Sequence, residues 1–418
     1  MSTQSDNIIT SSNVYDRLKH IFYPAFYFVF GTAWIYFLSS YLHVIPNGIA
    51  IQINDAIFHL DTSIWINRIE NPNWTEISVS HPLRPFIWAE LARYLSLTVD
   101  TDLGVSAVYG AKLLNALLFG VALVCLTSFS KQLLNDNIKV FLICFFTMMC
   151  STVAVVATPD HFGISFSLLI ISVYFAHLDK NLGYLIFLQI LMLVLLGGTT
   201  ITNALFPSLM ICYLLYRENA TIVNIYRKYR AKINTVAFIL VSVAILFVLV
   251  SKWDRLASGD SYFVKFFNFR LIDEPLVAIQ YSLSAIIYPI VSVAPHIVES
   301  RVSLEPINFS NINPFNIFTS LIWLYCLIKG VSLMWQSSTS RLLLLALSAW
   351  LFFNIILHNL WGDEFFLFSP HWTISLLVSF IYFAKKTKLT ALLLLITPLL
   401  LGQLLFFIKV ENLLSLLY

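Results

Sequence analysis

Long apolar runs separated by short polar stretches dominate this chain of 418 residues. A run of about 20 apolar residues is long enough to cross the hydrocarbon core of a membrane as a helix. The apolar positions are continuous rather than alternating with polar ones, which excludes a transmembrane β-barrel. The pattern predicts about eleven transmembrane helices. They cover residues 21–42, 105–127, 138–158, 161–177, 183–198, 201–216, 234–252, 315–335, 341–360, 367–384 and 389–409.

Composition supports the same fold class. Hydrophobic residues make up 59% of the chain and charged residues 11%, against about 25% charged residues in a soluble domain. We therefore expect an all-α polytopic membrane protein whose single integral domain covers residues 1–418. The apolar stretch Pro275–Val298 is read as a membrane-surface or re-entrant segment, because counting it as a span would move a later lysine cluster to the opposite side.

Basic residues indicate how the chain is oriented. With the predicted spans, most of them fall on one side, which the positive-inside rule makes cytoplasmic. This side carries Arg17, Lys19, Lys131, Lys139, Lys180, Arg217, Arg227, Lys228, Arg230, Lys232, Arg341, Lys385, Lys386 and Lys388. The amino terminus is then inside, and the first helix is expected to be a retained signal anchor. A net charge of +3 gives no reason to expect nucleic-acid binding.

Two long segments, residues 43–104 and 253–314, fall on the external side. Loops much longer than about 15 residues are usually functional or disordered. Aromatic residues are frequent in both segments, so we expect short amphipathic helices lying on the membrane surface.

The external side also collects ionisable residues. Asp363, Glu364 and His371 lie in the short aromatic stretch Trp361–Trp372 between two predicted spans. Aromatic residues are ordinary at a membrane interface. Carboxylates at a membrane edge are costly to keep there, which makes them functional candidates. We expect this stretch to contribute to a site.

Asp55 follows the first predicted span and lies on the same external side. A carboxylate there could take a proton from an acceptor hydroxyl, as a general base does in group transfer. Asn54 or Asp55 could equally be the N-cap of a helix over residues 56–65. Both interpretations stay open.

His81 and Arg84 belong to the sequence His81-Pro-Leu-Arg-Pro85 in the first external segment. The prolines are compatible with a purely structural role, because proline ends one helix and favours the start of the next. The guanidinium of Arg84 would suit a lipid phosphate. His81 could donate to the same anion or cap a helix.

Lys112 and the pair Asp160-His161 lie near the outer ends of predicted spans. An ammonium about two turns inside a span most often extends to the membrane surface, and phosphate contact is the alternative. Asp160 occupies an N-cap position after Thr158-Pro159, so capping is the favoured interpretation and a role in the site is the second.

The order of these features resembles the GT-C superfamily of membrane glycosyltransferases, especially the branch of protein mannosyltransferases and lipid A aminoarabinose transferases. The matching elements are Asp55, then His81-Pro82-Leu83, then the small-residue segment Gly110–Ala116 with Lys112. The similarity covers roughly the first 180 residues. The chain has Asn54-Asp55 in place of the usual acidic pair, and Leu83-Arg84 where the family has a second proline.

This resemblance implies transfer of a sugar from a polyprenyl-phosphate carrier to a glycan or lipid acceptor at the external face, with inversion at the anomeric carbon. Asp55 would be the base. The donor phosphate would be bound by Arg84, Lys112, Arg270 and His371, and the substrates would be contacted by His81, Asp160, His161, Asp363 and Glu364. No cofactor is required, although Asp55 and Asp363 could hold a divalent cation.

Two other functions fit the same polar face. In a transporter or flippase of a lipid-linked saccharide, the polar residues would form one end of a path. Such a path should continue inward, whereas the predicted spans carry few ionisable residues near their middle. In a non-catalytic scaffold of an envelope-assembly complex, Asp55 and Asp363-Glu364 would be replaceable.

Overall fold

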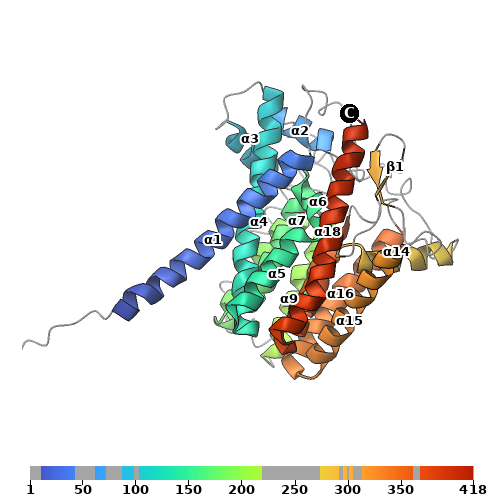
Figure 1. Cartoon of the computed structure of the whole chain (residues 1–418). Helices are drawn as coiled ribbons and strands as arrows, with labels where there is room; N and C mark the ends of the chain where they lie inside the picture. Colours follow the sequence, from blue (N-terminus) through green and yellow to red (C-terminus); the bar gives the residue numbers. More distant parts are fainter. Residues whose placement is uncertain are drawn as a thin grey trace, which may run out of the picture.

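The computed structural model describes residues 11–42, 62–71, 87–97, 103–218, 274–290, 295–298, 301–304, 313–360 and 368–417. Within these stretches the protein is helical apart from one short antiparallel hairpin (Figure 1). The elements are α1 (Ser11–Leu42), α2 (Thr62–Glu70), α3 (Ala89–Ser96), α4 (Leu103–Leu134), α5 (Asn137–Met149), α6 (Thr152–Ala157), α7 (His161–Ala176), α8 (Leu182–Thr199), η3 (Ile201–Ala204), α9 (Leu205–Arg217), α14 (Pro275–Ile287), β1 (His296–Val298), β2 (Arg301–Ser303), α15 (Pro314–Trp335), α16 (Ser338–Leu360), α17 (Ser369–Lys386) and α18 (Leu389–Leu417).

Six helices among the described residues are long and apolar enough to cross a membrane, namely α1, α4, α8, α15, α16 and α18. Three further apolar helices, α5, α7 and α14, are shorter. The all-α membrane character expected from the sequence is confirmed. The expected number of spans stays a prediction, and the span predicted over residues 234–252 lies outside the described residues.

The span predicted over residues 138–158 is not one continuous helix. Helix α5 ends at Met149 and α6 begins at Thr152. Between them the backbone of Cys150 is extended, with a ψ angle of 145°. A helix of 13 residues is only about 20 Å long. Apolar character continues through the break, so the pattern of hydrophobic residues could not reveal it.

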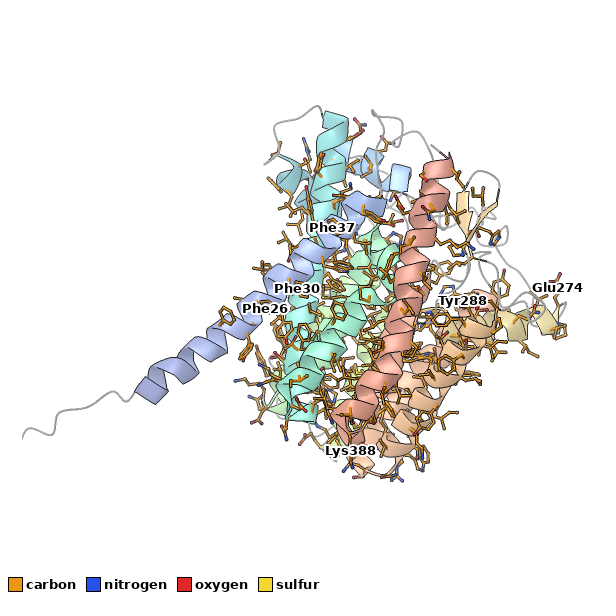
Figure 2. The ribbon with its side chains drawn as sticks, viewed as in Figure 1. Phe26, Phe30, Phe37, Glu274, Tyr288 and Lys388 are labelled. Atoms are coloured by element: carbon orange, nitrogen blue, oxygen red, sulfur yellow. The ribbon has the colours of Figure 1, made fainter. Side chains whose placement is uncertain are left out.

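Helix α14 has 13 residues and ends inside the bundle. Side chains from α15, α17, α18 and the break before α6 donate hydrogen bonds to backbone carbonyls in its last turn and the turn that follows. These bonds join Trp372 Nε1 to Ala285 O (2.8 Å), Trp323 Nε1 to Ile286 O (2.9 Å), Ser151 Oγ to Tyr288 O, and Gln403 Nε2 to Ile290 O. Figure 2 shows Glu274 at the outward end of this helix and Tyr288 at its inner end. The segment is therefore too short to span and is anchored by its carboxyl end.

Helix α1 packs antiparallel along α4, and its amino-terminal end projects from the rest of the molecule (Figure 1). The approach is close because Gly120 has no side chain: a Cβ there would lie 2.3 Å from Thr32 Oγ1 and 2.8 Å from Phe28 O. Phe26 and Phe37 lie on this helix (Figure 2) and are 41% and 57% exposed. Exposed phenylalanines on a membrane helix suit contact with lipid tails.

The two ends of the bundle carry different polar groups. At one end, Lys139 Nζ donates to Ala384 O (3.0 Å) and Thr387 O (2.5 Å) at the carboxyl end of α17. Lys388 lies at this same end, away from α2 and α3 (Figure 2). The amino-terminal ends of α7 and α17 meet at the opposite end, where the ring centroids of Phe162 and His371 are 5.5 Å apart. This separation agrees with the topology expected from the basic residues, and the orientation in a membrane stays a prediction.

Candidate functional site

A buried amide on α4 fixes the turn that leads into α7. Asn115 Nδ2 lies 2.9 Å from Thr158 O, 3.0 Å from Asp160 O and 3.4 Å from Val156 O. Gly163 leaves room for this amide, because a Cβ there would lie 2.8 Å from Asn115 Nδ2 and 2.6 Å from Val156 O. Turn carbonyls buried in a helical bundle need such donors. Asn115 therefore determines where α7 begins.

Asp160 caps α7. The backbone N–H of His161 donates to Asp160 Oδ1 at 2.5 Å, and His161 Nδ1 forms a short contact with the same oxygen. The two residues are 0% and 2% exposed, so the pair is shielded from solvent. The capping role favoured from the sequence is confirmed. Direct contact of Asp160 or His161 with a substrate stays a prediction.

Lys112 is enclosed by protein. It lies three residues before Asn115, on the same face of α4. Its side chain is 3% exposed, and Nζ lies 5.8 Å from the centre of the Tyr109 ring. The described residues supply no carboxylate within ion-pair distance of this ammonium. A side chain so well covered does not fit extension to the membrane surface, and anion contact, the alternative from the sequence, stays a prediction.

Histidine and phenylalanine rings from three helices pack together beside the start of α7. His371 of α17 lies 5.5 Å from Phe162 and 6.2 Å from His358 of α16, measured between ring centroids. His358 stacks on Phe368 at 3.8 Å. His371 is 2% exposed, and neither ring nitrogen has a hydrogen-bond partner in the described part of the chain. Its ring nitrogens are therefore available to a ligand.

We call the group formed by Lys112, Asn115, Asp160, His161, His358 and His371 the outer polar cluster. All six are buried, and they come from α4, α7, α16, α17 and the turn before α7. The cluster combines a cation with imidazoles and a carboxylate in a place shielded from water. A buried ammonium and imidazole N–H donors stabilise developing negative charge, whereas the Asp160 carboxylate serves as the cap of α7. Within the described residues, no group of three or more metal-ligating side chains could hold a metal ion.

Four of the residues expected from the sequence are therefore brought to one end of the bundle: Lys112, Asp160, His161 and His371. The others lie outside the described residues, so their positions relative to the cluster stay predictions. These are Asp55, His81, Arg84, Arg270, Asp363 and Glu364.

Sequence reasoning missed Asn115 and His358. One signal was present for Asn115, because it is a polar residue in an apolar span three positions from Lys112. His358 lies in the last turn of α16, where a histidine is also favoured by the helix dipole. Only the packing of α16 against α17 shows that His358 belongs beside His371.

Glu70, the last residue of α2, is a further carboxylate that sequence reasoning missed. Its Oε1 is buried and has no hydrogen-bond partner among the described residues. Burial raises the pKa of this carboxyl above its ordinary value of 4.5. The folded protein therefore binds this proton more tightly than the unfolded chain does, and Glu70 is a second acid, besides Asp55, in the segment predicted to be external.

Replacing Glu70 with glutamine is expected to raise the free energy of unfolding at neutral pH. Because the folded-state pKa exceeds the unfolded value, wild-type stability falls as pH rises from about 4.5 through the folded-state value. The glutamine variant lacks this loss, so the two proteins should converge in stability at lower pH. Thermal unfolding in detergent between pH 4 and pH 8, in steps of about one unit, measures the difference. A variant less stable than wild type at pH 8 would contradict this interpretation.

Comparison with protein-family models gave no match, and comparison with curated proteins gave no relative. The geometry of the site and the resemblance in sequence pattern are therefore what support a function.

Proposed function

We propose that this protein is a membrane glycosyltransferase that moves a sugar from a polyprenyl-phosphate carrier to a glycan or lipid acceptor at the external face of a bacterial inner membrane. The reaction needs a hydrophobic environment for the lipid, a cation for the phosphate and a base for the acceptor hydroxyl. The bundle of apolar helices supplies the first. The outer polar cluster supplies the second, and an acid of the first external segment supplies the third.

The observation that carries this proposal is the buried Lys112 ammonium. A charge taken out of water is costly unless a counter-charge compensates for it. Lys112 is 3% exposed and has no carboxylate partner among the described residues. An anionic substrate would provide a counter-charge that the described residues do not supply. A phosphate at the head of a lipid chain is an anion that reaches this depth from within a membrane.

Each proposed residue has a role in the transfer step. Asp55 takes the proton of the acceptor hydroxyl while the acceptor oxygen bonds to the anomeric carbon. The bond from that carbon to the phosphate oxygen breaks on the opposite side, so the anomeric configuration inverts. Lys112 and His371 stabilise the charge that develops on the leaving phosphate. The remaining contacts are assigned to His81, Arg84, Asp160, His161, Arg270, Asp363 and Glu364.

The proposal is tested by incubating purified protein with a panel of polyprenyl-phosphate sugars and a membrane glycan extract as the acceptor. Release of free polyprenyl phosphate is measured for the wild type, Asp55→Asn and the control Asp179→Asn. Asp179 is exposed and lies in the turn after α7, at the opposite end from the cluster. We expect Asp55→Asn to lose release almost completely and Asp179→Asn to keep it.

Two results would change the assignment. Wild-type release by Asp55→Asn would remove Asp55 as the base and leave Glu70 as the next acid to test. No release from any donor, with lipid-linked saccharide still bound, would replace the enzyme by a flippase.

A further inference from the structure

The N-cap residue of α17, Phe368, makes no side-chain capping hydrogen bond, as is also the case for α3, α6, α9 and α14. Asp136, Asp160, Asn181 and Asn313 cap α5, α7, α8 and α15 through side-chain oxygens. Among the described residues, no such side-chain oxygen caps α17, an 18-residue helix with Pro370 in its first turn. Backbone N–H groups at a helix start need acceptors, and the helix dipole favours a negative one.

Two side chains in the first turn of α17 have polar atoms without a hydrogen-bond partner among the described residues. Ser369 is 0% exposed and His371 is 2% exposed. Neither the Ser369 hydroxyl nor the two ring nitrogens of His371 have a hydrogen-bond partner in the part of the chain that the structure describes. Burying such groups without partners costs free energy, so they are rarely left unused.

The carbonyls of the same turn, in contrast, are bonded. Thr373 Oγ1 donates to Ser369 O at 2.7 Å, and Trp350 Nε1 donates to His371 O at 2.5 Å. These two bonds fix the position of the turn through its backbone carbonyl oxygens. The buried groups left without a partner among the described residues are the Ser369 hydroxyl and the His371 imidazole, and both can donate at a helix start that favours negative charge. A set of donors at a helix amino terminus is suited to an anion with several oxygens.

We propose that the first turn of α17, through Ser369, His371 and its backbone N–H groups, binds the phosphate group of an isoprenoid phosphate. This inference rests on the proposed function, because the phosphate is that of the donor's lipid carrier. Helix α17 packs against both α4 and α7. Lys112 of α4 supplies positive charge at the same end of the bundle, and Phe162 of α7 packs on the His371 ring. A tetrahedral phosphate has enough oxygens to accept from all these donors.

Binding of farnesyl phosphate to the purified protein in detergent, measured by calorimetry, tests the site without any sugar transfer. The variants are Ser369→Ala and, as a matched control, Ser375→Ala. Ser375 is a buried serine of the same helix whose hydroxyl already donates to Leu347 O at 3.0 Å. We expect the affinity of Ser369→Ala to be about tenfold lower than that of the wild type, because a hydrogen bond to a charged group is lost. Ser375→Ala should bind as the wild type does.

Competing probes identify the source of the phosphate. Farnesol should not bind at the site, because it has the chain without the anion, whereas inorganic phosphate should compete weakly. Equal competition by phosphatidylglycerol would overturn the isoprenoid assignment in favour of a bulk lipid headgroup. Equal affinity of Ser369→Ala and wild type for farnesyl phosphate, or no binding by the wild type, would overturn the site itself.

A second variant, His371→Gln, tests the same site through another residue. We expect its affinity for farnesyl phosphate to fall by a similar factor. Transfer assays on the same preparations separate this inference from the proposed function. If binding of farnesyl phosphate depends on Ser369 but no donor supports transfer, the proposed glycosyltransferase function is wrong and the phosphate site is supported. Transfer by Ser369→Ala with unchanged kcat and KM would remove the site and leave the function.

Discussion

Replacing Lys112 with methionine is expected to lower the rate of sugar transfer by about 100-fold or more while leaving the protein folded. The loss should be large because Lys112 is a buried cation at the proposed site, and removing one preorganised group that stabilises developing negative charge commonly has an effect of this order. Initial rates of polyprenyl phosphate release at saturating donor measure the change.

The thermal stability of Lys112→Met, unlike its transfer rate, should not fall. A buried ammonium without a carboxylate partner among the described residues destabilises the ligand-free protein, so Lys112→Met is expected to unfold at the same temperature as the wild type or higher. Lys131→Met is the matched control. Lys131 lies on the same helix at the opposite end, with Nζ 4.4 Å from the centre of the Tyr23 ring. Equal loss of transfer in both variants would contradict a specific role of Lys112.

Replacing Asn115 with alanine is expected to lower both stability and transfer. The variant leaves three turn carbonyls, at Val156, Thr158 and Asp160, without their side-chain donor. Losing these bonds inside the bundle should cost about 2 kcal/mol in the free energy of unfolding. Transfer should fall further than the folded fraction does, because the turn positions Asp160 and His161.

Gln189→Ala separates the two effects. Gln189 is also a buried amide, and it joins α8 to α7 by donating to Ser172 O (2.8 Å) and accepting from Ser172 Oγ (2.7 Å), away from the cluster. We expect a similar loss of stability and little change in kcat per folded molecule. If Asn115→Ala also keeps the kcat of the wild type per folded molecule, Asn115 is structural only.

Much of the helical framework could be predicted from the sequence, because each long apolar run must satisfy its backbone hydrogen bonds internally. The predicted run 315–335 corresponds to α15, Pro314–Trp335, and 389–409 lies within α18. The break between α5 and α6 could not be predicted this way. It depends on bonds such as Ser151 Oγ to Tyr288 O, which join residues far apart in the chain.

The site was only partly predictable for a related reason. Lys112 and His371 attract attention in any membrane sequence because charged and titratable groups are rare there. Asn115 and Ser369 are ordinary polar residues of helices, and they acquire meaning only from what surrounds them. For Asn115 this is a buried turn with three backbone carbonyls that accept hydrogen bonds from its side-chain amide. For Ser369 it is a helix start whose N-cap residue, Phe368, makes no side-chain capping bond.

The measurement that tests the central claim most directly follows a donor labelled in its sugar, in sealed vesicles that contain the purified protein and a glycan acceptor. The products are separated into intact donor, free polyprenyl phosphate and labelled acceptor. We predict that label moves from donor to acceptor with release of an equal amount of free polyprenyl phosphate, and that vesicles with Lys112→Met show neither product. Intact donor crossing the bilayer without cleavage would contradict glycosyl transfer and identify a flippase.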